Sequence, residues 1–166
     1  MGKPRPGDWL TGDLTRLAAR GADILACLMT PAELAETGLA ALPQAARSAG
    51  LTFVHAPTPD RGIPDVSVLP VLLDAYRAGR HVAAHCRFGI GRSATLAAAV
   101  LVVAGAEPGT AWDAIERARG VPVPDTPAQR RWVEGLITYR GRLANGQPPT
   151  AQLGANIGPN GRCDAR

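Results

Sequence analysis

The stretch that decides the fold is residues 81–93, which reads His81-Val82-Ala83-Ala84-His85-Cys86-Arg87-Phe88-Gly89-Ile90-Gly91-Arg92-Ser93. It begins as a short apolar run and leads into a second apolar segment, residues 94–104, so the pattern predicts a strand, a tight loop and a helix. Two glycines between Cys86 and Arg92 allow a tightly curled backbone. Amides at a helix N-terminus bind anions, and a guanidinium suits two oxygens of a phosphate. The stretch therefore predicts a phosphate-binding loop with a cysteine at its base.

Cys86 is the expected nucleophile of this loop. The helix dipole, the loop amides and Arg92 all favour a thiolate over a thiol, and a thiolate that faces a bound phosphate can attack phosphorus. The phosphate-binding residues are expected to be Arg87, Phe88, Gly89, Ile90, Gly91 and Arg92. Phe88 and Ile90 would contribute amides while their side chains pack outward or line the rim. A buried cysteine followed by an unrelated turn is the alternative, and it leaves the other residues of the set unexplained.

The combination His85-Cys86-x-x-Gly89-x-Gly91-Arg92-Ser93 resembles the signature loop of the cysteine-based protein tyrosine phosphatases. The resemblance implies a cysteinyl-phosphate intermediate on Cys86, with Arg92 holding the phosphate oxygens. It also implies that His85 orders the loop and stabilises the thiolate without transferring a proton. Ser93 would hydrogen-bond the sulfur and ease its departure, and a serine here is equally suited to cap the following helix.

The leaving oxygen needs a proton, so a carboxylic acid must reach the pocket from another element. Residues 56–64 resemble the acid loop of the same family, which follows a strand and carries a Pro-Asp pair, here Pro59-Asp60. The resemblance assigns the acid to Asp60, although an aspartate beside a proline is also an ordinary turn residue. Asp65 is better explained as the N-cap of the next helix.

Two further residues have a functional and a structural interpretation. Gln129 matches the position where the family often has a glutamine that orients the hydrolytic water, but Thr126 to Gln129 is also a capping box. Cys27 lies on a predicted strand that could neighbour the Cys86 strand, and some relatives protect the nucleophile by a disulfide with a second cysteine. A small buried core residue is the simpler interpretation of Cys27.

Composition bounds the class of protein. The chain has 166 residues, 46% hydrophobic and 19% charged, which indicates one ordinary globular domain. The net charge of +4 suits phosphorylated or acidic partners but is too small and scattered to indicate nucleic-acid binding. Three widely spaced cysteines form no metal cluster or disulfide framework, which favours a reducing compartment. No signal peptide or membrane span is indicated, so we expect a cytoplasmic protein. The sequence implies no metal or organic cofactor.

The rest of the chain alternates strands and helices. We expect strands over 22–29, 51–55 and 80–85, and a brief strand-like segment at Trp9-Leu10. Helices are expected after Leu10, over 30–50 with a break near Gly38, and over 65–79, 93–105, 110–120 and 126–142. This order predicts an α/β fold with a central, mostly parallel sheet flanked by helices, as in the cysteine phosphatases. Residues 1–144 would form the phosphatase catalytic domain, and residues 145–166, rich in Gly, Pro, Asn and Gln, are expected to be disordered.

The order of the parts resembles the compact dual-specificity phosphatases, because the acid loop precedes a mid-chain cysteine. The expected function is hydrolysis of phosphomonoesters, namely phosphotyrosine and also phosphoserine or phosphothreonine in a protein substrate. The alternatives are a phosphoinositide phosphatase, an RNA 5′-phosphatase and an inactive phosphate-binding module of the same fold. Ile90, where the phosphoinositide enzymes tend to have a base, makes the first less favoured, and the intact set of Cys86, Arg92, Ser93 and Asp60 disfavours the last.

Overall fold

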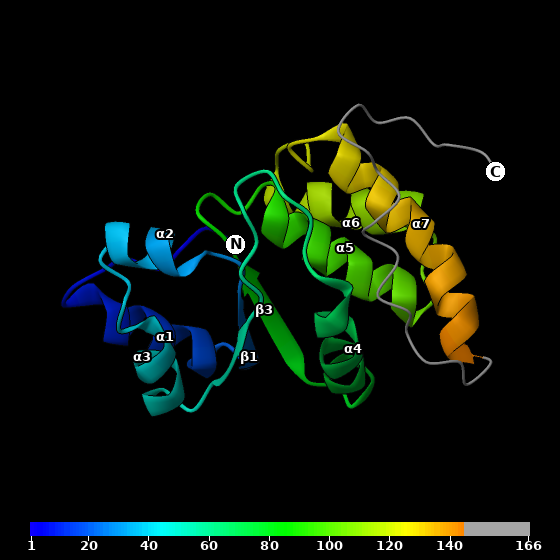
Figure 1. The fold of residues 1–166 in the computed structure, drawn as a ribbon. Helices are drawn as coiled ribbons and strands as arrows, with labels where there is room; N and C mark the ends of the chain where they lie inside the picture. The colour runs from blue at the N-terminus through cyan, green and yellow to red at the C-terminus, as the bar shows by residue number, and fades with distance from the viewer. Residues whose placement is uncertain (145–166) are drawn as a thin grey trace.

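The computed structural model describes residues 1–144, and the expected disorder of residues 145–166 lies outside this range (Figure 1). The strands are β1 (Ala22–Cys27), β2 (Thr52–His55) and β3 (His81–His85). The helices are α1 (Trp9–Ala19), α2 (Pro31–Glu36), α3 (Leu42–Ser48), α4 (Leu69–Arg77), α5 (Arg92–Ala104), α6 (Pro108–Arg119) and α7 (Pro127–Ala144), with a short 3₁₀ turn, η1 (Val66–Val68), before α4.

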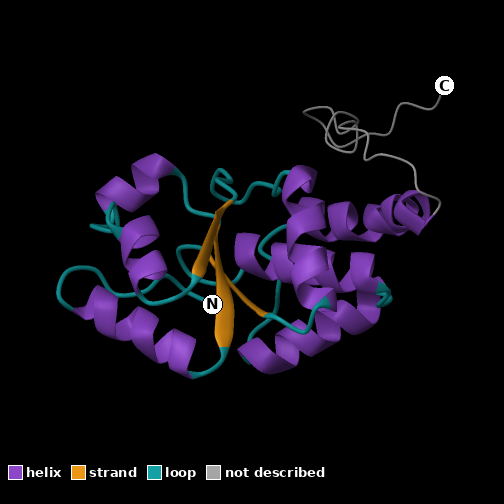
Figure 2. Ribbon diagram, turned by 90° about the horizontal axis from the view of Figure 1, so that it is seen from below, coloured by secondary structure: helices purple, strands orange, loops and turns teal. Residues whose placement is uncertain are grey.

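The three strands form one parallel sheet in the order β2-β1-β3 (Figure 2). Cys27 at the end of β1 lies opposite His55 of β2 and His85 of β3, so all three strands end at one edge of the sheet. The loops that follow these ends meet there, which places residues 56–64 beside the loop that begins at Cys86. The predicted α/β class with a parallel sheet is confirmed.

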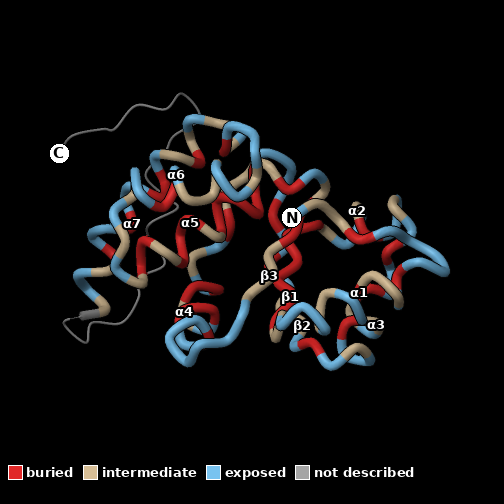
Figure 3. Tube along the Cα trace, turned by 180° about the vertical axis from the view of Figure 1, so that it is seen from behind, coloured by how far each residue is buried: buried red, intermediate tan, exposed pale blue. Residues whose placement is uncertain are grey.

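Helices cover both faces of the sheet, with α1 to α3 on one side and α4 to α7 on the other (Figure 1). The central strand β1 is apolar on both faces because it serves both layers. Ile24 and Ala26 pack toward the α4–α7 layer, whereas Leu25 and Cys27 pack toward α1 and α3. The buried residues are accordingly concentrated along β1 and α5 (Figure 3).

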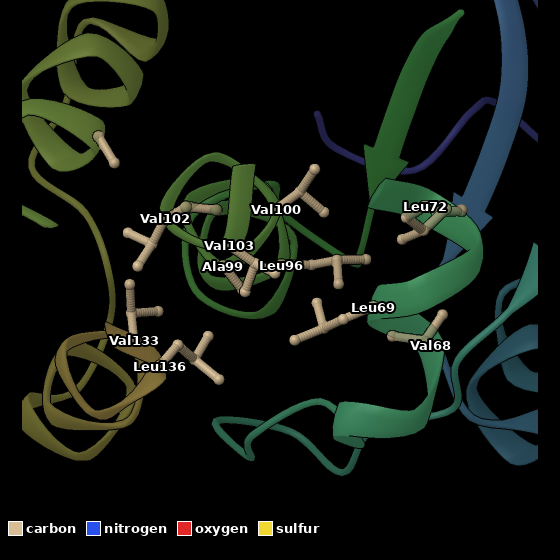
Figure 4. Close-up of a cluster of buried hydrophobic side chains, with 14 of the residues drawn as sticks. Val68, Leu69, Leu72, Leu96, Ala99, Val100, Val102, Val103, Val133 and Leu136 are labelled. Carbon is tan, nitrogen blue, oxygen red and sulfur yellow. The ribbon is translucent and has the colours of Figure 1, made fainter. Parts of the chain in front are cut away.

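Helix α5 is apolar nearly all round because α4, α6, α7 and β3 surround it. Figure 4 shows Leu96 and Val100 on the side of α4, and Val102 and Val103 near Val133 and Leu136 of α7. Truncation of one such buried leucine to alanine typically costs about 2–5 kcal/mol. The packing fixes the start of α5, which is where Arg92 and Ser93 lie.

The expected strand at Trp9-Leu10 is wrong, because α1 begins at Trp9. A two-residue apolar pair cannot distinguish the two periods, and the helix is favoured by the buried stripe that Leu10 forms with Leu14. The break near Gly38 is confirmed: α2 ends at Glu36, and Gly38 has a φ of 69°, which a glycine adopts readily.

Candidate active site

The signature loop, residues 86–92, joins β3 to α5 through two glycines with distinct constraints. Gly89 has a φ of 81°, and a Cβ there would overlap the backbone of Met1 and Gly2. A Cβ on Gly91 would overlap the carboxylate of Asp125. The loop therefore requires glycine at both positions. Gly89 is needed for its backbone conformation and for the close approach of Met1 and Gly2, and Gly91 is needed for the close approach of Asp125.

Cys86 lies at the base of the loop, with only 3% of its surface exposed. Its Sγ accepts a hydrogen bond from the Gly89 amide at 3.2 Å and lies 3.4 Å from the Ser93 hydroxyl oxygen. Burial alone raises the pKa of the thiol, but hydrogen bonds from Ser93, Gly89 and Phe88 together outweigh it and lower the pKa below its ordinary value. Hydrogen bonds that stabilise the charged form favour a thiolate at this position.

Arg92 is buried, with 2% of its surface exposed, and its guanidinium contacts three other residues. Its guanidinium makes a two-pronged ion pair with Glu33 at 2.7 and 2.8 Å. It also donates to the Thr58 carbonyl at 2.9 Å and lies 3.3 Å from the Asp60 carboxylate. These contacts fix the plane of the guanidinium before any ligand arrives.

Glu33 is a site residue that the sequence analysis missed. The segment Thr30 to Glu33 was recognisable as a capping box, and the structure contains both bonds of that box, at 2.9 and 3.2 Å. The same carboxylate also pairs with Arg92, which lowers the pKa of Glu33 from 4.5 to about 2. The signal that could have found it is its place in α2, the first helix after β1, at the edge where the strand ends meet.

Asp60 lies at the tip of the acid loop, residues 56–64, with 71% of its side chain exposed. The tip is a turn in which the Gly62 amide donates to the Pro59 carbonyl at 2.8 Å and Arg61 has a φ of 57°. The Thr58 amide donates to Leu28 at 3.1 Å, so the base of the loop is tied to the end of β1. Asp65 accepts a bond from the Ser67 amide at 2.8 Å, which confirms it as the cap of the next helical turn.

Gln129 is fully buried, and both ends of its amide are bonded. Its Nε2 donates to the Gly62 carbonyl at 2.9 Å, and its Oε1 accepts from the Thr126 amide at 3.2 Å. The capping-box interpretation is confirmed, and the same side chain ties the start of α7 to the acid loop. The water-orienting role of Gln129 stays a prediction.

Asp125 is a second residue that sequence reasoning missed. It lies in the segment between α6 and α7, is exposed, and its carboxylate contacts Gly91 of the signature loop. Among the described residues it makes no hydrogen bond or ion pair. The available signal was its position next to the Thr126 capping box, four residues before Gln129.

His85 is completely buried directly before Cys86, and neither ring nitrogen has a partner within residues 1–144. Burial first, and then the nearby Met1 ammonium, lower the pKa of its imidazole to about 4. The ring is therefore neutral at physiological pH, so any effect on the thiolate comes from packing and polarity rather than from a positive charge.

Residues 1–3 also contact the signature loop, which no sequence pattern indicated. The Met1 ammonium donates to the Ala84 carbonyl at 2.6 Å, and the Cys86 amide donates to the Met1 carbonyl at 3.3 Å. The Lys3 amide donates to the Arg87 carbonyl at 3.3 Å. This segment thus supports the loop from the side opposite β1.

The side chains of the loop point to different surroundings. Arg87 pairs with Glu36 of α2 at 2.7 Å, so its charge is directed away from the loop centre. Phe88 is 71% exposed at the rim, and Ile90 packs against the core beneath. As expected, Phe88 faces outward.

The arrangement brings together a thiol of lowered pKa, a fixed guanidinium, loop amides and an exposed carboxylate. This set can bind a phosphate and supports nucleophilic attack on phosphorus. Over residues 1–144 no group of three or more His, Cys, Asp or Glu side chains could hold a metal ion. The helices in that range are also too short or too polar to cross a membrane.

The fold and the site define a dual-specificity-like phosphatase of the cysteine-based protein tyrosine phosphatase superfamily. The chain belongs to the family described as "Polymorphic toxin system, DSP-PTPase phosphatase", which matches residues 1–106. A comparison with curated protein sequences gave no match.

Solved structures of phosphatases share the fold. Kinase associated phosphatase (KAP), in a form whose catalytic-site cysteine is replaced by serine, has 22% identity and a TM-score of 0.71, with 86% of this chain and 85% of that chain covered. Tk-PTP in its active form has 26% identity and a TM-score of 0.62, with 83% and 90% covered. PTPMT1 in complex with PI(5)P has 21% identity and a TM-score of 0.66, with 79% and 87% covered.

Proposed function

We propose that this phosphatase hydrolyses phosphomonoesters on proteins through a cysteinyl-phosphate intermediate on Cys86. The observation that carries the proposal is the environment of the Cys86 sulfur, which accepts from the Gly89 amide at 3.2 Å and lies beside Ser93 at the start of α5. A buried cysteine with a core role alone would have a raised pKa, whereas the pKa of the Cys86 thiol is lowered by the hydrogen bonds it accepts. Such an environment is typical of a nucleophilic thiolate.

In the first step the Cys86 thiolate attacks phosphorus, and the bond from phosphorus to the leaving oxygen breaks. Asp60 donates its proton to that oxygen, so the product leaves as an alcohol or phenol. Arg92 and the loop amides hold the equatorial oxygens as charge spreads over them. The 3.3 Å separation of Asp60 from Arg92 supports this assignment, because a phosphate bound to Arg92 lies within reach of the acid.

In the second step water attacks the phosphocysteine and the sulfur–phosphorus bond breaks. The Asp60 carboxylate takes the proton from the water, and the Ser93 hydroxyl stabilises the departing thiolate. Inorganic phosphate and the starting protonation states result. Because the cycle needs a free thiolate, we propose that the protein works in the cytoplasm or an equally reducing compartment.

A phosphoprotein is the proposed substrate class, and phosphotyrosine with phosphoserine or phosphothreonine the proposed range. The exposed Phe88 ring offers an apolar contact at the rim for a peptide side chain. Arg87, the base that would suit a phosphoinositide headgroup, is engaged by Glu36. The fold shared with PTPMT1, solved with PI(5)P, keeps a phosphoinositide substrate as the alternative to be tested.

The test is a chelator-containing assay with phosphopeptides, phosphoinositides and 5′-triphosphorylated RNA. We expect turnover of phosphopeptides, reversible inhibition by vanadate, and a loss of at least about 10³-fold in Cys86→Ser with oxyanion binding retained. Cys27→Ser is the matched control. Full activity in Cys86→Ser would eliminate the covalent mechanism, and turnover confined to phosphoinositides or RNA would replace the proposed substrate class. Binding of all phosphates without turnover would indicate a binding module.

A further inference from the structure

Arg61 occupies a backbone position that an arginine rarely adopts. Its φ is 57°, and among the described residues it is the non-glycine residue with a positive φ. The Gly62 amide donates to the Pro59 carbonyl at 2.8 Å, so Arg61 is the third residue of a four-residue turn that begins at Pro59. A turn with a positive φ at its third residue normally has glycine or asparagine there. The turn itself therefore gives no reason for an arginine.

This unusual position lies at the mouth of the proposed site. Gly62 cannot relieve it, because a Cβ on Gly62 would lie 2.8 Å from the Pro59 carbonyl and the glycine is needed for that close approach. Arg61 directly follows Asp60, whose carboxylate lies 3.3 Å from Arg92. Non-glycine residues held at positive φ cluster at active sites and ligand clamps. The conformation of Arg61 thus points to a role in binding.

Arg61 is also the arginine of the two loops that has no acidic partner within residues 1–144. Arg87 pairs with Glu36 at 2.7 Å, and Arg92 pairs with Glu33 at 2.7 Å. The Arg61 side chain is exposed and makes no hydrogen bond or ion pair in that range. Its charge is therefore available to a molecule that binds at the mouth of the site.

The surroundings narrow the group that Arg61 can bind. In the proposed mechanism Arg92 and the loop amides take the reacting phosphate, and a guanidinium otherwise suits a carboxylate. A peptide continues on both sides of its phosphorylated residue, and neighbouring residues of an extended chain are about 3.4 Å apart along the chain. Asp125, whose carboxylate contacts Gly91, would repel an acidic side chain from the signature loop. A carboxylate is therefore favoured on the side of the acid loop alone.

We propose that Arg61 is a specificity-determining residue, which binds the carboxylate of a glutamate or aspartate next to the phosphorylated residue of the substrate, on one side only. The inference rests on the proposed function, because it names the phosphopeptides that the same site would prefer. Arg61 is not required to touch the reacting atoms. It is therefore expected to change the choice among phosphopeptides.

The test uses three peptides with blocked ends, Ala-Gln-X-Gln-Ala, Ala-Glu-X-Gln-Ala and Ala-Gln-X-Glu-Ala, where X is phosphotyrosine or phosphothreonine. With the whole chain, we expect kcat/KM for one of the two acidic peptides to exceed that for the neutral peptide about threefold, as for an exposed ion pair. The preference should vanish in 1 M sodium chloride, where the screening length is about 3 Å. Hydrolysis of all three peptides with equal kcat/KM would overturn the inference and leave the proposed function intact.

Substitutions at position 61 separate the charge from the backbone. Asparagine and aspartate adopt a positive φ more readily than arginine, so Arg61→Asn and Arg61→Asp keep the turn. Arg61→Asn is expected to abolish the preference, and Arg61→Asp to disfavour the acidic peptide about threefold. Arg61→Lys is expected to retain the preference. Each preference is a ratio of two substrates on one variant, so any effect on the neighbouring Asp60 cancels.

Arg47→Gln is the matched control. Arg47 is an exposed residue of α3, just before the amino end of β2, and so lies at the opposite end of the sheet from the site. The substitution lowers the net charge by the same amount as Arg61→Asn and is expected to leave the preference unchanged. Equal loss of the preference in both variants would show an effect of net charge and overturn the role of Arg61.

Two further outcomes would assign the site differently. Hydrolysis of a phosphoinositide but of none of the peptides would overturn both the inference and the proposed substrate class. A preference for a bisphosphorylated over a monophosphorylated phosphoinositide, lost in Arg61→Asn and without any preference among the peptides, would assign Arg61 to a second phosphate. That result would overturn the peptide carboxylate as its partner.

Discussion

The two loops that meet at the carboxyl edge of the sheet are held in different ways. In the signature loop Cys86 is buried, its sulfur accepts from the loop, and Arg92 is fixed from three directions. In the acid loop Asp60 is exposed and is restrained by one 3.3 Å contact with Arg92. The difference indicates that the proposed phosphate-binding loop is preorganised, whereas the position of the proposed proton donor depends on the loop that carries it.

Arg92 connects the two loops. The same guanidinium that would bind phosphate donates to the Thr58 carbonyl at the base of the acid loop. On the other side Gln129 donates to the Gly62 carbonyl at 2.9 Å. The exposed tip with Asp60 thus lies between two fixed points, so substitutions at the fixed points are expected to act through the position of Asp60.

Among the substitutions that test this difference between the two loops, Asp60→Asn is expected to have the largest effect on activity. It removes the proposed proton donor, while the hydrogen bond to the Cys86 sulfur and the ion pair of Arg92 with Glu33 stay in place, so phosphopeptide hydrolysis is expected to slow by on the order of 10²-fold. An activated aryl phosphate, whose leaving group needs little protonation, is expected to slow less. The measurement is a pair of pH–rate profiles on one good and one poor leaving group, and the alkaline limb is expected to flatten.

Asp65→Asn is the matched control for this prediction. Asn is itself a good cap, so its side-chain oxygen can accept the hydrogen bond from the Ser67 amide in place of the carboxylate. Both the pH–rate profile and the stability are therefore expected to stay unchanged. An intact alkaline limb in Asp60→Asn, with its loss in Asp65→Asn, would assign the acid to Asp65 instead.

The sequence predicted the signature loop far better than its surroundings. Cys86, Arg92 and Ser93 are close in the chain, and the strand, glycines and helix that fix them are local as well. The contact of Arg92 with Glu33 spans 59 residues, and no spacing rule relates the two. The Thr30 to Glu33 capping box is a local pattern that the sequence contains, but its second function depends on where β1 ends.

The other omissions have the same physical origin. Asp125 and Met1 contact the signature loop from segments without a periodic pattern, so only tertiary packing brings them there. The strand order, with β3 at an edge, likewise does not follow from alternating strands and helices. The strand expected at Trp9-Leu10 failed because two apolar residues fit either period.

The second prediction concerns the fixed point on the other side of Arg92. Glu33→Gln keeps the capping box, because its amide oxygen can still accept from the Thr30 amide and Arg92 Nη1. It removes the charge that pairs with Arg92 and replaces the oxygen that accepts from Arg92 Nη2 by an amide donor. We expect kcat/KM to fall about tenfold and stability to fall by about 2 kcal/mol, because a buried guanidinium loses a charged partner. Glu36→Gln, at an exposed pair with Arg87, is the control and is expected to change little.

The pH dependence of this stabilisation follows from the pKa of Glu33, which is lowered from 4.5 to about 2. A carboxylate whose pKa is lower in the folded state stabilises the fold above its unfolded pKa. The stabilisation is therefore complete above about pH 4.5 and is lost as the pH falls toward about 2. Thermal unfolding of the wild type and Glu33→Gln should converge across this window, and a constant difference would contradict the ion-pair explanation.

The third prediction separates the two roles considered for Gln129. Gln129→Glu keeps the capping box but loses the Nε2 donor to Gly62, so the acid loop loses one of its fixed points. The substitution also sets a carboxylate oxygen against the Gly62 carbonyl at a fully buried position, where the two acceptors repel. We expect phosphopeptide turnover to slow at least about three- to tenfold. Exposed Gln44→Glu is the control. If Gln129 acts by holding the acid loop, both steps that use Asp60 slow together, and rapid-quench measurement should show no more phosphoenzyme than in the wild type.

Accumulation of phosphoenzyme in Gln129→Glu would instead support the water-orienting role that the sequence predicted. Asp125→Asn sharpens the distinction, because its carboxylate is exposed and contacts Gly91, whereas the Gln129 amide is buried. A burst of product followed by slow turnover in Asp125→Asn alone would place the orientation of water at Asp125.

The smallest effect is expected at Cys27. Mild peroxide should inactivate the enzyme and a thiol should restore it, because a thiolate of lowered pKa is the preferred target of oxidation. Cys27 is poorly suited to assist this recovery. It packs toward α1 and α3, whereas Cys86 packs toward the α4–α7 layer, and burial raises the pKa of the Cys27 thiol to about 11.

Cys27→Ala is therefore expected to be inactivated and restored at the rates of the wild type, within about a factor of two, since a protonated thiol attacks an oxidised sulfur slowly. Activity is followed after peroxide and again after dithiothreitol, with Cys163→Ser measured alongside so that the third cysteine is accounted for. Slower recovery in Cys27→Ala, together with a peptide containing both Cys27 and Cys86 in a non-reducing digest, would make Cys27 the resolving partner. It would also require the end of β1 to rearrange, because thiols that pack into different core layers cannot bridge without backbone movement. The signature loop would then be less rigid than its contacts indicate, and the contrast with the acid loop would be one of exposure alone.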